Sequence, residues 1–169
     1  MAKRVFQVAS FTPTAQADGT ALTSATYMAI GAGSATQELR LIEIMETGLA
    51  TSSAVNIMQF ARDLVLGATP TALAAPNGDG PLNTGTAALA VPPLTFVAAT
   101  TGPSRTNTAA TARLNLAFNA FGGIVRWSAA PGEEWQILGT TVSVSESSLS
   151  AFTGGSVGLM GAHIVYEPY

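Results

Sequence analysis

The sequence predicts an all-β fold: a two-sheet antiparallel β-sandwich, jelly-roll-like, with long loops rich in Pro, Ala, Thr and Gly. Three observations predict it. Apolar and polar residues alternate over short segments, Gly- and Pro-containing turns separate these segments, and no segment reads as a helix joining two parallel strands. A count of about eight such strands is typical of a sandwich or barrel. We expect residues 1–169 to form a single domain.

In the first part of the chain, alternation predicts strands over residues 4–8, 26–30 and 38–46. The third strand has no cleanly polar face, so we expect it to be covered on both sides. One of its faces carries Leu39, Leu41 and Met45 with Glu43 interrupting them, and the other carries Arg40, Ile42, Ile44 and Glu46.

Residues 55–66 fit either a strand or a helix capped by Ser52 or Ser53, and their β-branched and aromatic content favours a strand. Residues 67–112 differ in composition, because prolines punctuate an almost uncharged run of Ala, Thr and Gly. This pattern predicts long ordered loops with one strand over residues 94–98. Long loops inside a compact domain are usually functional, so we expect this tract to contact neighbouring subunits.

The sharpest pattern lies between Leu114 and Leu138. Residues 114–119 alternate as a half-buried strand, and Gly122-Gly123 predicts a break. Pro131-Gly132 suits the centre of a type II turn, since proline presets φ and glycine accepts a positive φ. We therefore expect a hairpin in which Trp127 faces Trp135 and Val125 faces Ile137. Further strands are predicted over residues 140–145 and 157–167.

The composition of the chain limits the classes of function that the sequence allows. Charged residues make up 10% of the chain, and Lys3 is the single lysine, so little surface charge opposes contact with neighbours. A net charge of −3 disfavours binding to nucleic acid, and the absence of cysteine removes disulfides and thiolate metal sites. Apolar stretches are too short and too interrupted for a signal peptide or a membrane helix. We expect cytosolic synthesis without export, no membrane contact and no cofactor.

Catalytic patterns are weak. His163 is the single histidine, and a hydrogen-bonded residue in a packed strand or subunit contact explains it better than a metal ligand. Glu133 and Glu134 are adjacent, which on a strand would point them to opposite faces. Asn77-Gly78-Asp79-Gly80 offers oxygen ligands for calcium but lacks the further acids of an EF-hand, so a plain turn is favoured. We expect no catalytic, metal or cofactor-binding residues, and hence no enzyme.

Two segments near the C-terminus carry a resemblance, namely residues 114–127 (LNLAFNAFGGIVRW) and 129–133 (AAPGE), extended by residues 163–167 (HIVYE). They resemble small virion structural proteins of tailed bacteriophages, of the jelly-roll capsid decoration or cement type. The resemblance covers residues 114–169 and does not extend to residues 67–112. It implies a sandwich that decorates or cements the head and carries no catalytic residues.

We therefore expect a non-enzymatic virion structural protein on the capsid surface, whose partners are the major capsid protein and copies of itself, as a dimer or trimer. The alternative is a carbohydrate- or receptor-binding module, tail-associated or lectin-like. Its aromatic platform would be drawn from Phe121, Trp127, Trp135, Tyr166 and Tyr169, although core and interface packing explain these residues better. The residues expected to anchor the structure are Trp127, Pro131, Gly132 and Trp135.

Overall fold

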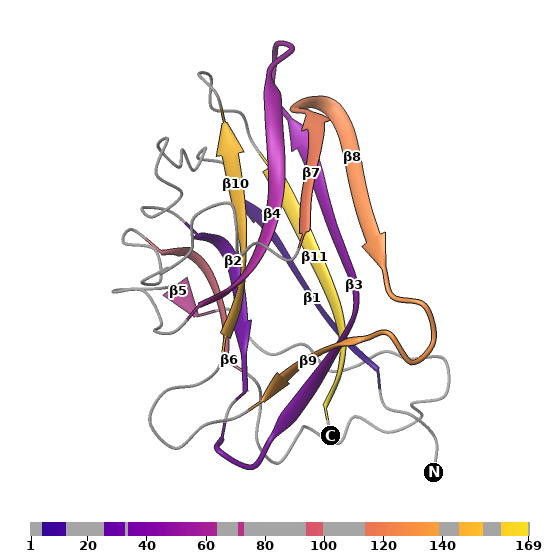
Figure 1. Ribbon diagram of the computed structural model, residues 1–169. Helices are drawn as coiled ribbons and strands as arrows, with labels where there is room; N and C mark the ends of the chain where they lie inside the picture. Colours follow the sequence, from indigo (N-terminus) through magenta and orange to yellow (C-terminus); the bar gives the residue numbers. More distant parts are fainter. Residues whose placement is uncertain are drawn as a thin grey trace.

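A computed structural model describes the chain over residues 5–12, 26–32, 34–63, 71–72, 94–99, 114–138, 146–153 and 160–168. Every regular element in these ranges is a β-strand, as the alternation predicts, and every strand pair is antiparallel (Figure 1). The strands are β1 (Phe6–Thr12), β2 (Thr26–Gly31), β3 (Glu38–Leu49), β4 (Val55–Asp63), β5 (Thr71–Ala72), β6 (Leu94–Ala99), β7 (Leu114–Asn119), β8 (Phe121–Ser128), β9 (Trp135–Leu138), β10 (Glu146–Thr153) and β11 (Met160–Pro168).

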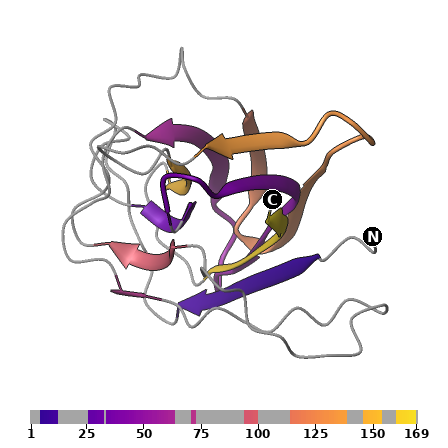
Figure 2. The same ribbon diagram turned by 90° about the horizontal axis from the view of Figure 1, so that it is seen from below.

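The strands pair into two sheets. One has five strands in the order β1-β11-β3-β8, with β9 also paired to β3, and the other has six in the order β5-β6-β2-β10-β4-β7. Seen from below, β1 lies at the edge of its sheet farthest from the orange segment that carries β8 and β9 (Figure 2). Among the described strands, β7 and β8 end their sheets, and because Ala120 alone joins them, these two ends lie on the same side of the molecule.

The core lies between these strands and is built mainly from β1, β3 and β11. Ile30 on β2 belongs to the same buried cluster, and the apolar residues of β7 pack against it, so both sheets contribute. Phe6 stacks on Tyr166 with ring centroids 5.9 Å apart. The cluster consists of Phe6, Val8, Ile30, Leu39, Leu41, Ile44, Ile137, Ala162, Ile164 and Tyr166.

The strict alternation predicted for residues 38–46 is wrong beyond Leu41, because β3 contains a bulge at Ile42. On β11, Val165 pairs with Glu43 while the next residue, Tyr166, pairs with Leu41, which leaves Ile42 without a partner on that strand. One extra residue reverses the side to which all later side chains point. The buried set changes from Leu39 and Leu41 to Ile44, Glu46 and Gly48.

The predicted hairpin between Trp127 and Trp135 is also wrong. Strands β8 and β9 do not pair with each other; both pair with β3, one after the other along the same edge. Trp127 lies opposite Ile44 and Trp135 lies opposite Leu41. The intervening loop leaves β3 at its bulge, where the Ala129 N–H donates to the Ile42 carbonyl at 2.8 Å. The length of β3 explains this, since one strand offers room for two partners.

The sequence predicts that Gly122-Gly123 breaks the strand. In the structure this pair instead forms a bulge inside β8. Pairing with β3 slips there, with Thr47 opposite Ile124 and Leu49 opposite Phe121. Gly122 has φ +69°, the left-handed conformation that glycine adopts at such bulges.

The ambiguous segment from residue 55 is a strand as far as Asp63, and the predicted strand at 94–98 corresponds to β6. Several predictions fall outside the described residues: the strand at 140–145, the turn at Asn77–Gly80, and the tract 67–112 apart from β5 and β6.

Candidate assembly interface

The turn at Pro131-Gly132 has the predicted conformation although it lies in a loop between β8 and β9. Gly132 has φ +88°, and the Glu133 N–H donates to the Ala130 carbonyl at 2.9 Å, which closes the turn. These features fit a type II turn. The Gly132 N–H also donates to Oε1 of Glu134 at 3.2 Å. Glu134 thus holds the turn, and the expected placement of Glu133 and Glu134 on opposite faces of a strand does not arise, because β9 begins at Trp135.

This loop brings the two tryptophans together. The rings of Trp127 and Trp135 stack with centroids 4.1 Å apart and an interplanar angle of 24°. Both are half-buried and pack against the core cluster. Each ring therefore covers one face of the other, and that face is closed to any sugar.

Replacing Trp127 by Ala should lower the free energy of unfolding by about 2 kcal/mol. Removing a half-buried ring costs roughly half as much as removing a fully buried one, and the stacking contact with Trp135 is lost as well. Urea unfolding followed by circular dichroism measures this in every variant, including the double variant, which contains no tryptophan. Trp135→Ala should cost a similar amount, and the double variant should cost less than the two single changes added together, since each single change already breaks the stack. Strict additivity would contradict the contact.

The side of the molecule formed by β7 and β8 leaves the core incompletely closed. On β1, β3 and β11 the inward side chains are buried, with Phe6, Leu41 and Ile164 at most 2% exposed. On β7 and β8 every second residue points inward, yet none of these side chains is fully buried. The half-buried apolar set is Leu114, Leu116, Phe118, Val125 and Trp127, joined by Trp135 of β9.

Four large apolar residues are exposed at the end of this side, where β3 leads into β4 and β7 leads into β8. They are Leu49, Val55, Phe121 and Ile124, exposed by 45, 67, 58 and 68%. We call β7, β8 and these four residues the β7–β8 side (Figure 1). Isolated exposed apolar residues are normal on protein surfaces, whereas grouped ones are typical of surfaces that bind partners.

The corner between β7 and β8 is held rigidly. The Ala120 N–H donates to the Ala54 carbonyl at 2.8 Å, and the Ala120 carbonyl accepts from the Ala50 N–H at 2.9 Å. Asn119 adds to this, because its Oδ1 accepts from the Phe121 N–H at 2.9 Å and its Nδ2 donates to Oγ of Ser53 at 2.9 Å. A groove of about 240 Å³ runs beside the corner, lined by Ser53, Ala54, Val55, Ala117, Phe118 and Asn119. The exposed apolar residues are thus presented on a fixed backbone.

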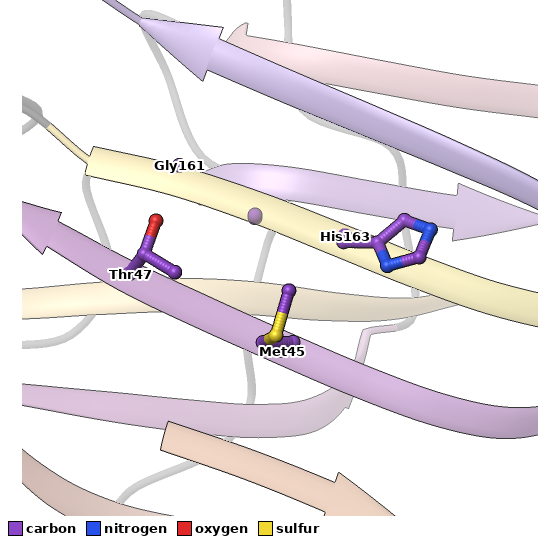
Figure 3. A pocket seen from close by; sticks show the side chains of 5 residues that line it. Met45, Thr47, Gly161 and His163 are labelled. Atoms are coloured by element: carbon purple, nitrogen blue, oxygen red, sulfur yellow. The ribbon is translucent and has the colours of Figure 1, made fainter. Parts of the chain in front are cut away.

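A second, smaller groove of about 120 Å³ lies on the outer face of the five-stranded sheet. It forms over Gly161, which has no side chain, between Met45, Thr47 and His163 (Figure 3). His163 is half-buried, and its Nε2 lies 3.2 Å from Oε1 of Gln7 on β1, so the histidine is hydrogen-bonded as expected. The groove has room for a few water molecules or one small side chain.

The same outer face carries an ion pair between Arg126 on β8 and Glu43 on β3. Glu43 raises the pKa of Arg126 above its usual value, first through their hydrogen bond and then through charge attraction. Arg126 is largely exposed, so the pair adds little stability.

Glu46 is the most unusual polar residue of the described core. Its side chain is 0% exposed, and neither carboxyl oxygen has a hydrogen-bond partner. Its neighbours across the sheet are Val125 on β8 and Ala162 on β11. Burial raises the pKa of Glu46 well above its usual value. The Tyr166 hydroxyl is likewise buried without a partner, and burial raises its pKa to about 12.

The remaining candidates do not converge on one place. Of the residues considered for an aromatic platform, Tyr166 is buried and Tyr169 lies outside the described residues, while Phe121 is exposed and so does not join the core. In the described ranges no three His, Asp or Glu side chains cluster as metal ligands would. The same ranges contain no helix that could span a membrane.

Sequence reasoning did not single out the β7–β8 side; it expected assembly contacts in residues 67–112, most of which lie outside the described residues. A signal for it exists: residues 114–125 contain no charged residue, although alternation marks them as a strand with one face outward. Comparison with known proteins adds no relative, since no family model and no curated protein matches the chain.

Proposed function

We propose that this chain is a non-enzymatic structural module of a virion, a capsid cement or decoration protein that binds major capsid subunits and stabilises the head. The observation that carries the proposal is the β7–β8 side, where half-buried core residues adjoin four exposed apolar ones. Leaving such a surface in water is unfavourable, and covering it with a neighbouring subunit lowers the free energy. A charge content of 10% also suits a protein whose surface is largely covered in an assembly.

We also propose that the two sheets pack as a jelly-roll-like sandwich. A jelly roll arises when a long antiparallel ribbon folds over, so that its first strand pairs with its last, its second with the one before the last, and so on inward. With β5 and β6 taken as an insertion and β9 as a continuation of β8, the pairs β1–β11, β2–β10, β3–β8 and β4–β7 follow this rule. Strand pairing therefore supports the proposal, and so does the apolar cluster shared by both sheets.

Cementing has a direct test. A bound subunit stabilises the particle by mass action, and many copies multiply a modest contact. Particles that lack this chain should release their DNA at a lower temperature than complete particles, and adding the purified chain back should restore the higher temperature. Light scattering and the fluorescence of a DNA-binding dye, followed during heating, measure the release temperature in both experiments. Equal release temperatures with and without the chain would contradict cementing.

A carbohydrate-binding module is the weaker candidate. It needs aromatic rings open to solvent on one face. Trp127 and Trp135 instead stack on each other against the core, and Tyr166 is buried.

A further inference from the structure

We infer that the β7–β8 side binds a second copy of this chain across a twofold axis, with β7 and β8 each antiparallel to its own copy. The inference deepens the proposed function, since it names the partner of the surface on which that function rests. It holds equally for an assembly other than a virion.

The first argument for this dimer comes from the two edge strands. Of the described strands, β7 is the last of the six-stranded sheet and β8 the last of the five-stranded sheet, and both lie on one side (Figure 1). An edge strand offers a row of backbone donors and acceptors to a further strand. A partner that covers this side must therefore offer two edges at the spacing that the core sets between β7 and β8. A second copy, turned about an axis perpendicular to the sheets, offers that pair of edges at that spacing.

The side-chain pattern carries the second step. When a strand pairs antiparallel with its own copy about a central residue, inward side chains meet inward ones, because side chains alternate with a period of two. Centred on Leu116, β7 would place Leu116 opposite its own copy and Leu114 opposite Phe118 of the second copy. All three are half-buried in the single chain. Pairing would extend the core across the axis and complete their burial.

The third argument comes from the low charge of β7 and β8. Residues 114–125, which comprise β7 and the first part of β8, contain no charged residue, and Arg126 farther along β8 is paired with Glu43 of β3. Such a surface neither repels its own copy nor attracts a charged partner. Proteins often block open edges with charged side chains, lysine above all, or with proline; β7 and β8 contain no lysine or proline, and their one charged residue, Arg126, is paired with Glu43. At the opposite edge of the five-stranded sheet, Phe6 and Val8 of β1 are each only 2% exposed, so that edge has no comparable opening.

The test compares lysine substitutions on the two edges. Ile124→Lys adds a charge at a position that is 68% exposed, so the change does not enter the core. Ala9→Lys adds the same charge at an exposed position of β1 and serves as the matched control. Sedimentation equilibrium of the full chain should give a dimer for the wild type and for Ala9→Lys. Ile124→Lys should raise the dissociation constant by about tenfold or more, because two like charges then lie close to the axis.

A wild type that stays monomeric overturns the inference, and so does a dimer that Ile124→Lys leaves intact. A trimer overturns it too, because a twofold pairing closes at two copies. Circular dichroism of each variant checks that it remains folded, and Phe121→Lys, at a position 58% exposed, repeats the test should Ile124→Lys unfold. A dimer that forms as described, in particles whose DNA release temperature does not depend on the chain, keeps this inference and contradicts cementing alone.

Discussion

Replacing Gly48 by Ala should lower the free energy of unfolding by about 3 kcal/mol or more, because the new methyl group would meet backbone atoms. A Cβ built on Gly48 lies 2.6 Å from the Cα and the carbonyl carbon of Ala120, and closer still to its carbonyl oxygen. Ala120 cannot yield without loss, since its N–H and C=O hold the corner through Ala54 and Ala50. The substitution must therefore displace β3 or break these hydrogen bonds.

Gly132→Ala is the control for this prediction. Gly132 has φ +88°, and nothing lies within 4 Å of a Cβ built there. Its cost should come from backbone strain alone, about 1 kcal/mol. Urea unfolding of both variants should rank Gly48→Ala as clearly the more harmful. A Gly48→Ala variant as stable as the wild type would contradict the close approach of β3 to the corner.

Replacing Glu46 by Leu should raise the free energy of unfolding by about 3 kcal/mol near neutral pH, the opposite direction to most core substitutions. The carboxyl group has no hydrogen-bond partner, so the folded protein carries its full desolvation cost. Leucine has a similar size and suits a site bordered by Val125 and Ala162. Thermal and urea unfolding of the two proteins measure the gain.

The gain should also depend on pH. The folded-state pKa of Glu46 is raised, so the folded protein holds this proton more tightly than the unfolded chain does. Stability from this group is therefore greatest below the unfolded pKa of about 4.3 and is lost as pH rises towards the folded pKa. The advantage of Glu46→Leu should grow over that range. Glu46→Gln, which cannot ionise, should remove this part of the pH dependence; an advantage that is constant with pH would contradict a buried, unpaired carboxyl group.

The strands could be predicted from sequence because a two-residue period is a local property. Residues 38–41 and 114–119 alternate, and both segments lie in strands of the structure. The turn could be predicted for the same reason. Pro131-Gly132 forms the expected turn although the strands on either side pair with a third strand and not with each other.

What could not be predicted depends on partners distant in sequence. The bulge at Ile42 exists because β11, β8 and β9 all meet β3 there, and no local pattern marks it. Without the bulge, Glu46 is assigned to the face of Ile42, and its burial beside Val125 and Ala162 is missed. The same limit produced the hairpin error, because a turn signal does not say whether the strands on either side pair with each other or share a third.

Hydrogen exchange tests most directly whether the β7–β8 side is the surface that assembly covers. The measurement compares backbone amides of residues 114–119 and 121–128 in the isolated chain at low concentration and in the assembled form, with β1 as the internal reference. We predict that assembly slows the outward-facing amides of β7 and β8 by about tenfold or more while β1 changes little. Equal exchange of β7 and β8 in both forms would contradict the account.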